Sequence, residues 1–286
     1  MTILSETSPC ILCGESGRTA PALRGILRRC TSCGFTWTAP SDDPTPDTEL
    51  YDEDYFRDGA YRDYFAEHAQ RRYEAARRLR WVQTLLRPRS VLEAGPAAGF
   101  FLEAARAAGI TVDGVEPAAV CVRFAREHLN LPIRQGCFET SPPPSAPVDA
   151  VCAFHVLEHV ADPHQFLTAA HRALRPGGAL AVEVPNIASA AAARQGGAWH
   201  ALQPAFHRWH FSPPSLTRLV EGHGFRVEHC DTVSVSYYLR PRYWISPRGG
   251  WMLVKEWAGA GNPRKPHPRR FDLLRLLATR RERDRW

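Results

Sequence analysis

The sequence has no run of about 18 apolar residues, the length needed to cross a bilayer, so we expect no membrane span. Residues 1–6 lack the basic and apolar segments of a secretory signal, and we therefore expect a cytoplasmic location. No internal repeat is visible. With 286 residues, of which 44% are hydrophobic and 23% charged, the composition is that of an ordinary globular protein that can bury a core without covalent help.

Positive charge is concentrated at the C-terminal end of the chain. Residues 240–286 contain 13 Lys/Arg and 4 Asp/Glu, a net charge of +9 against +6 for the whole chain, so the remaining residues carry −3. This basic C-terminal extension can be a solvated helix, or it can contact nucleic acid or another anionic partner. The leucines of residues 271–281 have helical spacing, and we expect a helix there.

Four of the eight cysteines form two Cys-x2-Cys pairs, and each pair is followed by a glycine that permits a tight turn. In a reducing compartment such pairs favour a metal over disulfides. Four thiolates complete a tetrahedral Zn²⁺ site with no open position, so the metal is structural. Residues 1–40 are predicted to form a zinc ribbon with the ligands Cys10, Cys13, Cys30 and Cys33. The other four, Cys121, Cys137, Cys152 and Cys230, are expected to be buried thiols.

Strands and helices alternate from about residue 89 onward. Apolar strands are expected at 91–94, 111–115, 148–154 and 179–184, with helices between them at 100–108, 118–128 and 162–174. Continuous apolar strands that alternate with helices predict an α/β fold with a doubly wound, Rossmann-like, mostly parallel sheet, which we assign to residues 89–239. Residues 41–88 are predicted to be a Pro-rich linker and a helical lid, in which Tyr51, Tyr55, Tyr61 and Tyr64 can cover a cationic ligand. Segments 233–239 and 251–257 are expected to be closing antiparallel strands.

A glycine-containing loop, Glu93-x-Gly95-x-Ala97-x-Gly99, follows the first strand. Glycines there let the backbone approach a ligand and let the next helix start close to the strand. The methyl group of Ala97 requires φ to stay negative at that residue. The spacing is not the Gly-x-Gly-x-x-Gly of nicotinamide enzymes. The second strand ends at Glu116, 21 residues after Gly95, where a carboxylate can accept hydrogen bonds from both hydroxyls of a ribose.

Two further motifs follow: residues 154–163, with the sequence Phe-His-Val-Leu-Glu-His-Val-Ala-Asp-Pro, and residues 174–178, with Leu-Arg-Pro-Gly-Gly. Together with the glycine loop they resemble the class I S-adenosylmethionine-dependent methyltransferases over roughly residues 89–230. With its N-terminal ribbon, the chain is similar to bacterial members of that family that methylate sugars or natural products. The resemblance implies S-adenosylmethionine as cofactor, bound by Glu93, Gly95, Ala97, Gly99, Glu116, Pro117, Cys137, Phe138, Phe154 and His155.

Methyl transfer is an in-line displacement at a carbon bound to sulfonium, so the protein must align the acceptor, exclude water and, where needed, accept a proton. Ligands of such folds lie beyond the C-terminal ends of the strands. Histidine is a suitable base near neutral pH. The catalytic candidates are His155, His159, His207 and His210. A catalytic metal near these residues has no support from carboxylate spacing in the sequence.

The expected function is methylation of a small molecule, a natural product or sugar precursor, at O, C or N. One alternative is an rRNA or tRNA methyltransferase that uses the ribbon and the basic tail. The ribbon has only four basic residues, and no Asn-Pro-Pro-Tyr motif is present. A second alternative is a non-catalytic interaction protein in which Ala97 marks a degraded cofactor loop. The sequence leaves the acceptor and the oligomeric state open.

Overall fold

The computed structural model describes residues 9–16, 19–39, 68–241, 250–251, 254, 262 and 265–281. The Pro-rich linker, the four tyrosines of the expected lid and most of segment 251–257 lie outside these residues. Among the described residues, no helix combines the length and the apolar character that crossing a membrane requires.

The core is a seven-stranded sheet with the order β10-β11-β8-β7-β4-β5-β6. Strands β4 to β8 pair in parallel, whereas β11 runs antiparallel to both β8 and β10. This mostly parallel sheet confirms the predicted α/β fold class. The strands are β4 (Ser90–Ala94), β5 (Thr111–Glu116), β6 (Ile133–Gln135), β7 (Val148–Phe154), β8 (Leu174–Pro185), β10 (Phe225–Val233) and β11 (Leu273–Arg280).

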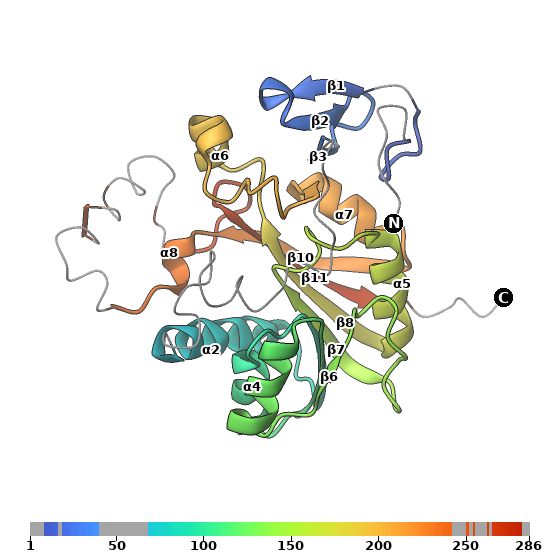
Figure 1. Ribbon diagram of the computed structural model, residues 1–286, viewed down its shortest axis with the longest axis vertical. Helices are drawn as coiled ribbons and strands as arrows, with labels where there is room; N and C mark the ends of the chain where they lie inside the picture. The colour runs from blue at the N-terminus through green and yellow to red at the C-terminus, as the bar shows by residue number, and fades with distance from the viewer. Residues whose placement is uncertain are drawn as a thin grey trace.

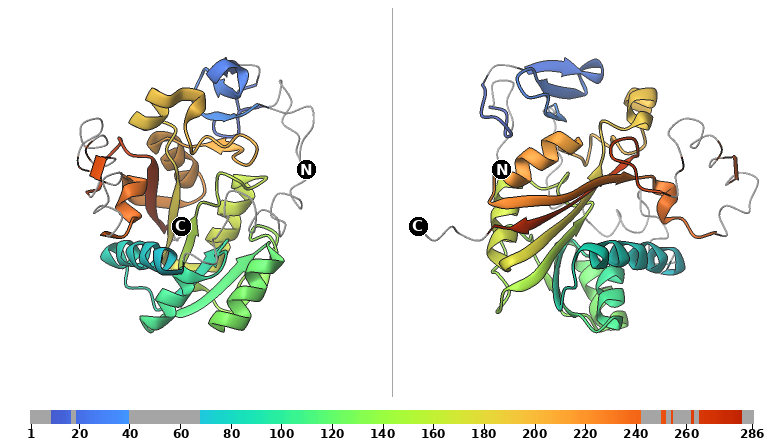
Figure 2. Two further views of the ribbon diagram at one scale, coloured as in Figure 1. Left: turned by 60° about the vertical axis from the view of Figure 1, so that its left-hand side comes forward. Right: turned by 180° about the vertical axis from the view of Figure 1, so that it is seen from behind.

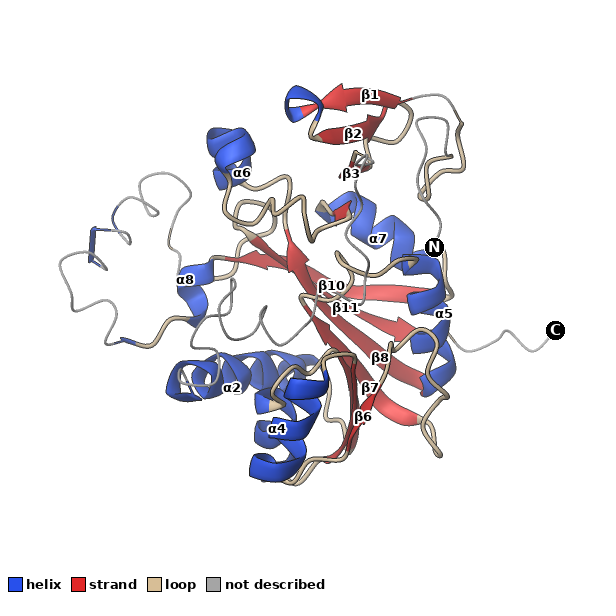
Figure 3. Cartoon of the chain, viewed as in Figure 1, coloured by secondary structure: helices blue, strands red, loops and turns tan. Residues whose placement is uncertain are grey.

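Helices cover both faces of the sheet (Figures 1 and 3). Along β7, Ala150 and Cys152 pack with the first helical layer, and Val151 and Ala153 pack with the second. Because both faces are covered, the strand is apolar at almost every position. The first layer contains α2 (His68–Leu85), α3 (Phe100–Ala107) and α4 (Ala119–Leu129); the second contains α5 (Pro163–Ala173) and α7 (Pro213–Glu221).

The C-terminal leucines form strand β11, so the helix expected at residues 271–281 is wrong. Leu274 and Leu276 pack on one face of the sheet, and Leu277 packs on the other. A run that is apolar on both sides satisfies a helical spacing as readily as a buried strand. The strand expected at 233–239 also differs: β10 ends at Val233, and Ser234 caps the short helix α8 (Val235–Tyr238) by accepting a hydrogen bond from the Ser236 amide.

The N-terminal ribbon joins the core through a second sheet with the order β1-β2-β3-β9. Strand β9 (Trp209–His210) comes from the loop that follows β8 and α6 (Ala190–Gln195), and it pairs with ribbon strand β3 (Thr36–Thr38). Phe35 of the ribbon stacks against Trp209, with ring centroids 6.2 Å apart. The ribbon therefore shares backbone pairing and buried aromatics with the core. Both views of Figure 2 show it at one end of the molecule. Its other strands are β1 (Thr19–Ala22) and β2 (Leu27–Cys30).

Candidate functional site

The four ribbon cysteines meet at one point. Their sulfur atoms all lie within 4.8 Å of one another, and the Cys10–Cys33 and Cys13–Cys30 Sγ pairs are 3.6 Å apart. A tetrahedral Zn²⁺ with Zn–S bonds of about 2.3 Å places its sulfurs about 3.8 Å apart, so these residues fit zinc. Each Cys-x2-Cys turn ends on a glycine in the left-handed region, with φ of 75° at Gly14 and 76° at the equivalent glycine of the second pair.

A cavity of about 920 Å³ opens at the C-terminal ends of the parallel strands. Its volume lies at the upper end of the range of ligand pockets, about 300–1,000 Å³. The glycine loop forms one wall. Gly95 has φ of 63°, and a Cβ there would stand 2.7 Å from a methyl carbon of Val156. Gly99 caps α3 but does not line the cavity; a Cβ on it would stand 2.5 Å from Leu131. Gly99 therefore serves close packing of the helix.

Ala97 adopts φ of 48°, so the expectation of a negative φ at this position is wrong. Its amide donates to Oε2 of Glu116 at 2.8 Å, and the Ala118 amide donates to Oε1 at 2.9 Å. The left-handed region costs a residue with a Cβ roughly 1–2 kcal/mol. The hydrogen bond to a buried carboxylate offsets that cost, because charge-assisted bonds contribute about 1.5–3 kcal/mol. The loop therefore keeps its cradle shape with alanine at position 97.

Both acidic residues predicted to bind the cofactor line the cavity and are 4% exposed. Burial raises the pKa of Glu116 to about 7, although two backbone hydrogen bonds act in the opposite direction. Burial also raises the pKa of Glu93 to about 8, although the positive charge of Arg78 acts to lower it. Oε2 of Glu93 accepts no hydrogen bond from the described residues. A buried acceptor without a partner is costly, so the site is suited to a ligand that carries donors.

The other predicted cofactor residues also line the cavity: Pro117, Cys137, Phe138 and Phe154. Phe138 and Phe154 are each 7% exposed, so their rings form an apolar wall. Cys137, which we expected to be buried, is exposed.

His155 lies between two carboxylates at the end of β7. Its Nδ1 is 3.3 Å from Glu158 Oε1, and its Nε2 is 3.4 Å from Glu183 Oε1. Burial lowers its pKa, but the two carboxylates outweigh burial and raise the pKa of His155 to about 9. The ring is therefore protonated at neutral pH and is not available there as a base. Its φ of 59° is unusual for a residue with a side chain, which is common at functional positions.

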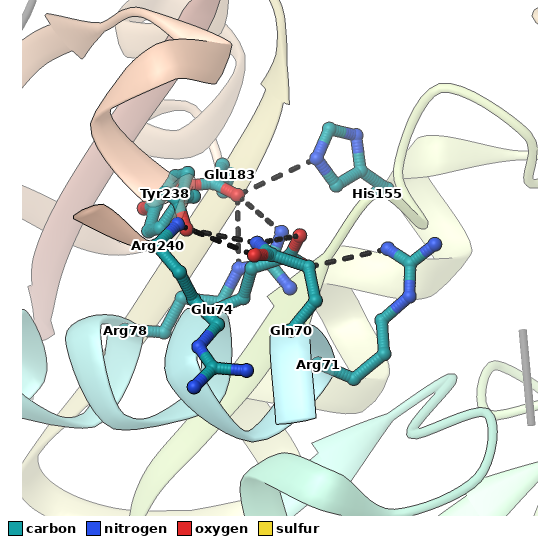
Figure 4. Close-up of polar contacts among 8 residues, drawn as sticks. All are labelled: Gln70, Arg71, Glu74, Arg78, His155, Glu183, Tyr238 and Arg240. Atoms are coloured by element: carbon teal, nitrogen blue, oxygen red, sulfur yellow. Dashed lines mark hydrogen bonds and ion pairs between the residues drawn. The ribbon is translucent and has the colours of Figure 1, made fainter. Parts of the chain in front are cut away.

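Glu183 anchors a network that the sequence did not reveal (Figure 4). Arg78 of α2 donates to its Oε1 from Nε at 3.0 Å and from Nη2 at 2.7 Å, and the hydroxyl of Tyr238 in α8 donates to its Oε2. Burial raises the pKa of Glu183, but Arg78, together with His155 and Tyr238, outweighs burial and holds the pKa well below its usual range. The only signal in the sequence was a lone glutamate inside an apolar strand, since a buried carboxylate requires partners.

His159 and His207 lie side by side at the cavity wall, with ring centroids 4.7 Å apart. Burial lowers the pKa of His159, and it lowers the pKa of His207 to about 4. His210 does not line this cavity. It is 3% exposed within β9, and its Nε2 lies 2.9 Å from the hydroxyl of Thr38 in the ribbon. The structure therefore brings three of the four predicted catalytic histidines to the cavity and places the fourth at the junction with the ribbon.

Residues 65–230 match the family model described as a methyltransferase domain. The chain belongs to this family. S-adenosylmethionine is the cofactor of these methyltransferases, so the class I assignment and its cofactor are confirmed. Solved relatives share the fold: a methyltransferase of Thermotoga maritima aligns over 77% of this chain and 95% of its own with 20% identity and a TM-score of 0.54. A methyltransferase of Archaeoglobus fulgidus aligns over 76% of this chain and 99% of its own, with 19% identity and a TM-score of 0.53.

The chain is also similar to curated proteins that are named as methyltransferases. A Mycolicibacterium smegmatis protein named as a probable S-adenosylmethionine-dependent methyltransferase is 37% identical over 51% of this chain and 55% of its own length. A ubiquinone biosynthesis O-methyltransferase of Methylocella silvestris is 33% identical over 41% of this chain and 47% of its own. The chain thus spans about half the length of these two relatives. It covers 68% of a ubiquinone biosynthesis O-methyltransferase of Methylobacterium nodulans, at 30% identity over 58% of this chain.

Proposed function

We propose that this methyltransferase moves the methyl group of S-adenosylmethionine to a hydroxyl oxygen of a small-molecule acceptor. One observation carries the proposal: a single cavity of about 920 Å³ borders both the glycine loop and the pair His159 and His207. A cavity at the upper end of the ligand-pocket range suits a cofactor and a small acceptor together. The similarity to ubiquinone biosynthesis O-methyltransferases supports oxygen as the methylated atom.

The residues of the cavity divide into a cofactor half and an acceptor half. When bound, S-adenosylmethionine supplies a methyl carbon on a positively charged sulfur, which needs no further activation as a leaving group. Glu116 accepts hydrogen bonds from the ribose hydroxyls, and the loop wall at Gly95 and Ala97 lets the aminoacyl end approach the backbone closely. Phe138 and Phe154 form an apolar wall that excludes water, while the Arg78–Glu183–Tyr238 network holds α2 and α8 over β8.

Two arginines of the basic C-terminal extension form hydrogen bonds inside the fold, which weighs against the nucleic-acid alternative. Arg275 is 1% exposed and donates to both carboxylate oxygens of Asp231, at 2.8 and 2.7 Å. Arg280 donates to the carbonyl oxygen of Leu174. These charges are engaged in holding β11 in the sheet, which reduces the charge left for phosphate contacts. RNA methylation is therefore not the function we propose.

A methylation assay tests the proposal. The purified chain is incubated with methyl-labelled S-adenosylmethionine and a panel of small hydroxylated acceptors, chiefly phenols, catechols and sugars, with total RNA as a separate arm. We expect label in an O-methyl product identified by mass spectrometry, lost in Glu116→Ala and retained in Glu127→Ala, a change at an exposed glutamate of α4. Label in RNA alone, or in carbon or nitrogen of the products, would refute the proposal.

A further inference from the structure

We propose that Glu158, His159 and His207 bind a divalent transition-metal ion at the cavity wall, distinct from the ribbon zinc. One ligand atom from each of the three lies within 4.8 Å of the other two. Two histidines and one carboxylate, with further positions open, form a common metal-binding set for Zn²⁺, Fe²⁺ and Mn²⁺. The residues come from the turn after β7 and from the loop before β9, which explains why no spacing in the sequence revealed them.

The hydrogen bonds of both rings orient them for metal binding. Nδ1 of His159 lies 3.1 Å from the carbonyl oxygen of Phe206, and Nδ1 of His207 lies 2.9 Å from that of Ala201. A carbonyl oxygen only accepts, so each Nδ1 carries the hydrogen and each neutral ring has its lone pair on Nε2. A backbone carbonyl that fixes the tautomer in this way is the usual support of a metal-ligating histidine. Nε2 of His159 lies 3.9 Å from Oε1 of Glu158.

The environment of the Glu158 carboxylate independently indicates a bound cation. The residue is 1% exposed, and neither carboxylate oxygen accepts a hydrogen bond of normal geometry from the described residues. Nδ1 of His155 lies 3.3 Å from Oε1 of Glu158, and the rings of His159 and His207 are the other members of the cluster. The contacts from His155 and His159 both reach Oε1, whereas Oε2 accepts no hydrogen bond from the described residues, and a buried carboxylate oxygen without a donor is costly. The arrangement therefore favours a bound cation.

The position of the cluster gives the ion a role that rests on the proposed function. His159 and His207 line the cavity that the glycine loop borders, so an ion held by them would lie beside the acceptor half. A hydroxyl oxygen coordinated to a divalent cation is more acidic than in water and releases its proton to solvent more readily. Methylation of an acceptor with one or two hydroxyls would then need no side-chain base.

Manganese binding tests the site without relying on activity. The full chain, with one Zn²⁺ in the ribbon, is titrated with Mn²⁺, and free Mn²⁺ is followed by electron paramagnetic resonance. We expect one Mn²⁺ per chain. His207→Ala and Glu158→Gln should each weaken binding about 100-fold or more, as loss of a direct ligand exceeds the 10–100-fold effect of supporting residues. His200→Gln, at an exposed histidine on the same cavity, should bind like the wild type.

Two controls make each outcome decisive. Circular dichroism and a zinc content of one ion per chain show whether a variant is folded. Two ligand variants are used so that the test remains possible if one of them fails to fold. No Mn²⁺ binding by the wild type, or equal binding by folded His207→Ala and Glu158→Gln, overturns the metal site. Calorimetry with S-adenosylhomocysteine on the same protein separates the two proposals: normal binding without a second metal refutes the metal site alone. Absent binding refutes the proposed function and leaves the manganese result standing.

Discussion

Replacement of Glu116 should weaken cofactor binding strongly, and the structure allows the size of the effect to be worked out. Each oxygen of this buried carboxylate already accepts one backbone hydrogen bond, from Ala97 or Ala118, at 2.8 and 2.9 Å. Each oxygen retains capacity to accept a ribose hydroxyl. In Glu116→Ala both ribose contacts are lost, and hydrogen bonds to charged groups contribute about 1.5–3 kcal/mol each. A loss of about 3 kcal/mol corresponds to a roughly 100-fold higher Kd.

The glutamine variant is not a neutral replacement here. Its amide group has one acceptor and one donor end, so either the Ala97 or the Ala118 amide must face an NH₂ group instead of an oxygen. An unsatisfied buried donor costs about 1–3 kcal/mol, which predicts a Kd about 10-fold or more above wild type. If the lost partner is Ala97, the alanine also loses the contact that offsets its left-handed φ of 48°.

Isothermal titration calorimetry with S-adenosylhomocysteine measures both variants. The exposed Glu127→Gln on α4 is the matched control and should bind like the wild type. Circular dichroism must show that each variant is folded. If folded Glu116→Ala binds S-adenosylhomocysteine with a Kd within about twofold of the wild-type value, the ribose does not contact Glu116. The orientation that we propose for the cofactor in the cavity would then be wrong.

Four further outcomes are expected. Burial raises the pKa of Glu116 to about 7, so protonation removes acceptor capacity below that pH. S-adenosylhomocysteine should therefore bind about tenfold more weakly at pH 6 than at pH 8. Calorimetry across this pH range measures the Kd, and a Kd that does not change with pH would contradict the prediction. Gly95→Ala, which sets a methyl group 2.7 Å from a valine side chain, should raise the Kd about tenfold or more in the same assay. Trp37 and Trp209 are each only 4% exposed in the folded ribbon junction. Removal of zinc by a chelator should expose both side chains to water and shift the tryptophan fluorescence to longer wavelength. An unchanged spectrum after verified zinc loss would show that the metal does not hold the ribbon. Asp162→Ala, which removes the cap that accepts from two backbone amides of α5, should lower the free energy of unfolding by about 1 kcal/mol in urea denaturation, and an unchanged midpoint would refute the cap.

The local parts of the site could be predicted from the sequence because their chemistry is local. The loop from Glu93 to Gly99 and the strand end at Glu116 lie close to one another in the chain, and their residue types report on the turn and on the ligand. Even there, a neighbour in space changed one conformation: the amide of Ala97 bonds to Glu116, which stabilises a positive φ that alanine alone would avoid.

The contacts between distant residues could not be predicted in this way. Arg78, Glu183 and Tyr238 come from a helix, a strand and a second helix, and only packing brings them together. His207 is 48 residues beyond His159 in the sequence, yet their rings are neighbours at the cavity wall. Periodicity reports which side of an element is apolar, but it does not report which other element covers that side.

The sequence by itself determined the alternation of strands and helices, the glycine loop and the four cysteines that fit zinc, because each depends on short-range spacing and turn chemistry. Only the tertiary structure decided that the leucines of 273–280 form a strand inside the sheet, since a run buried on both faces fits a helix and a strand equally well until its neighbours are known. The same holds for the cluster of Glu158, His159 and His207, which exists because the loop before β9 folds back over the end of β7.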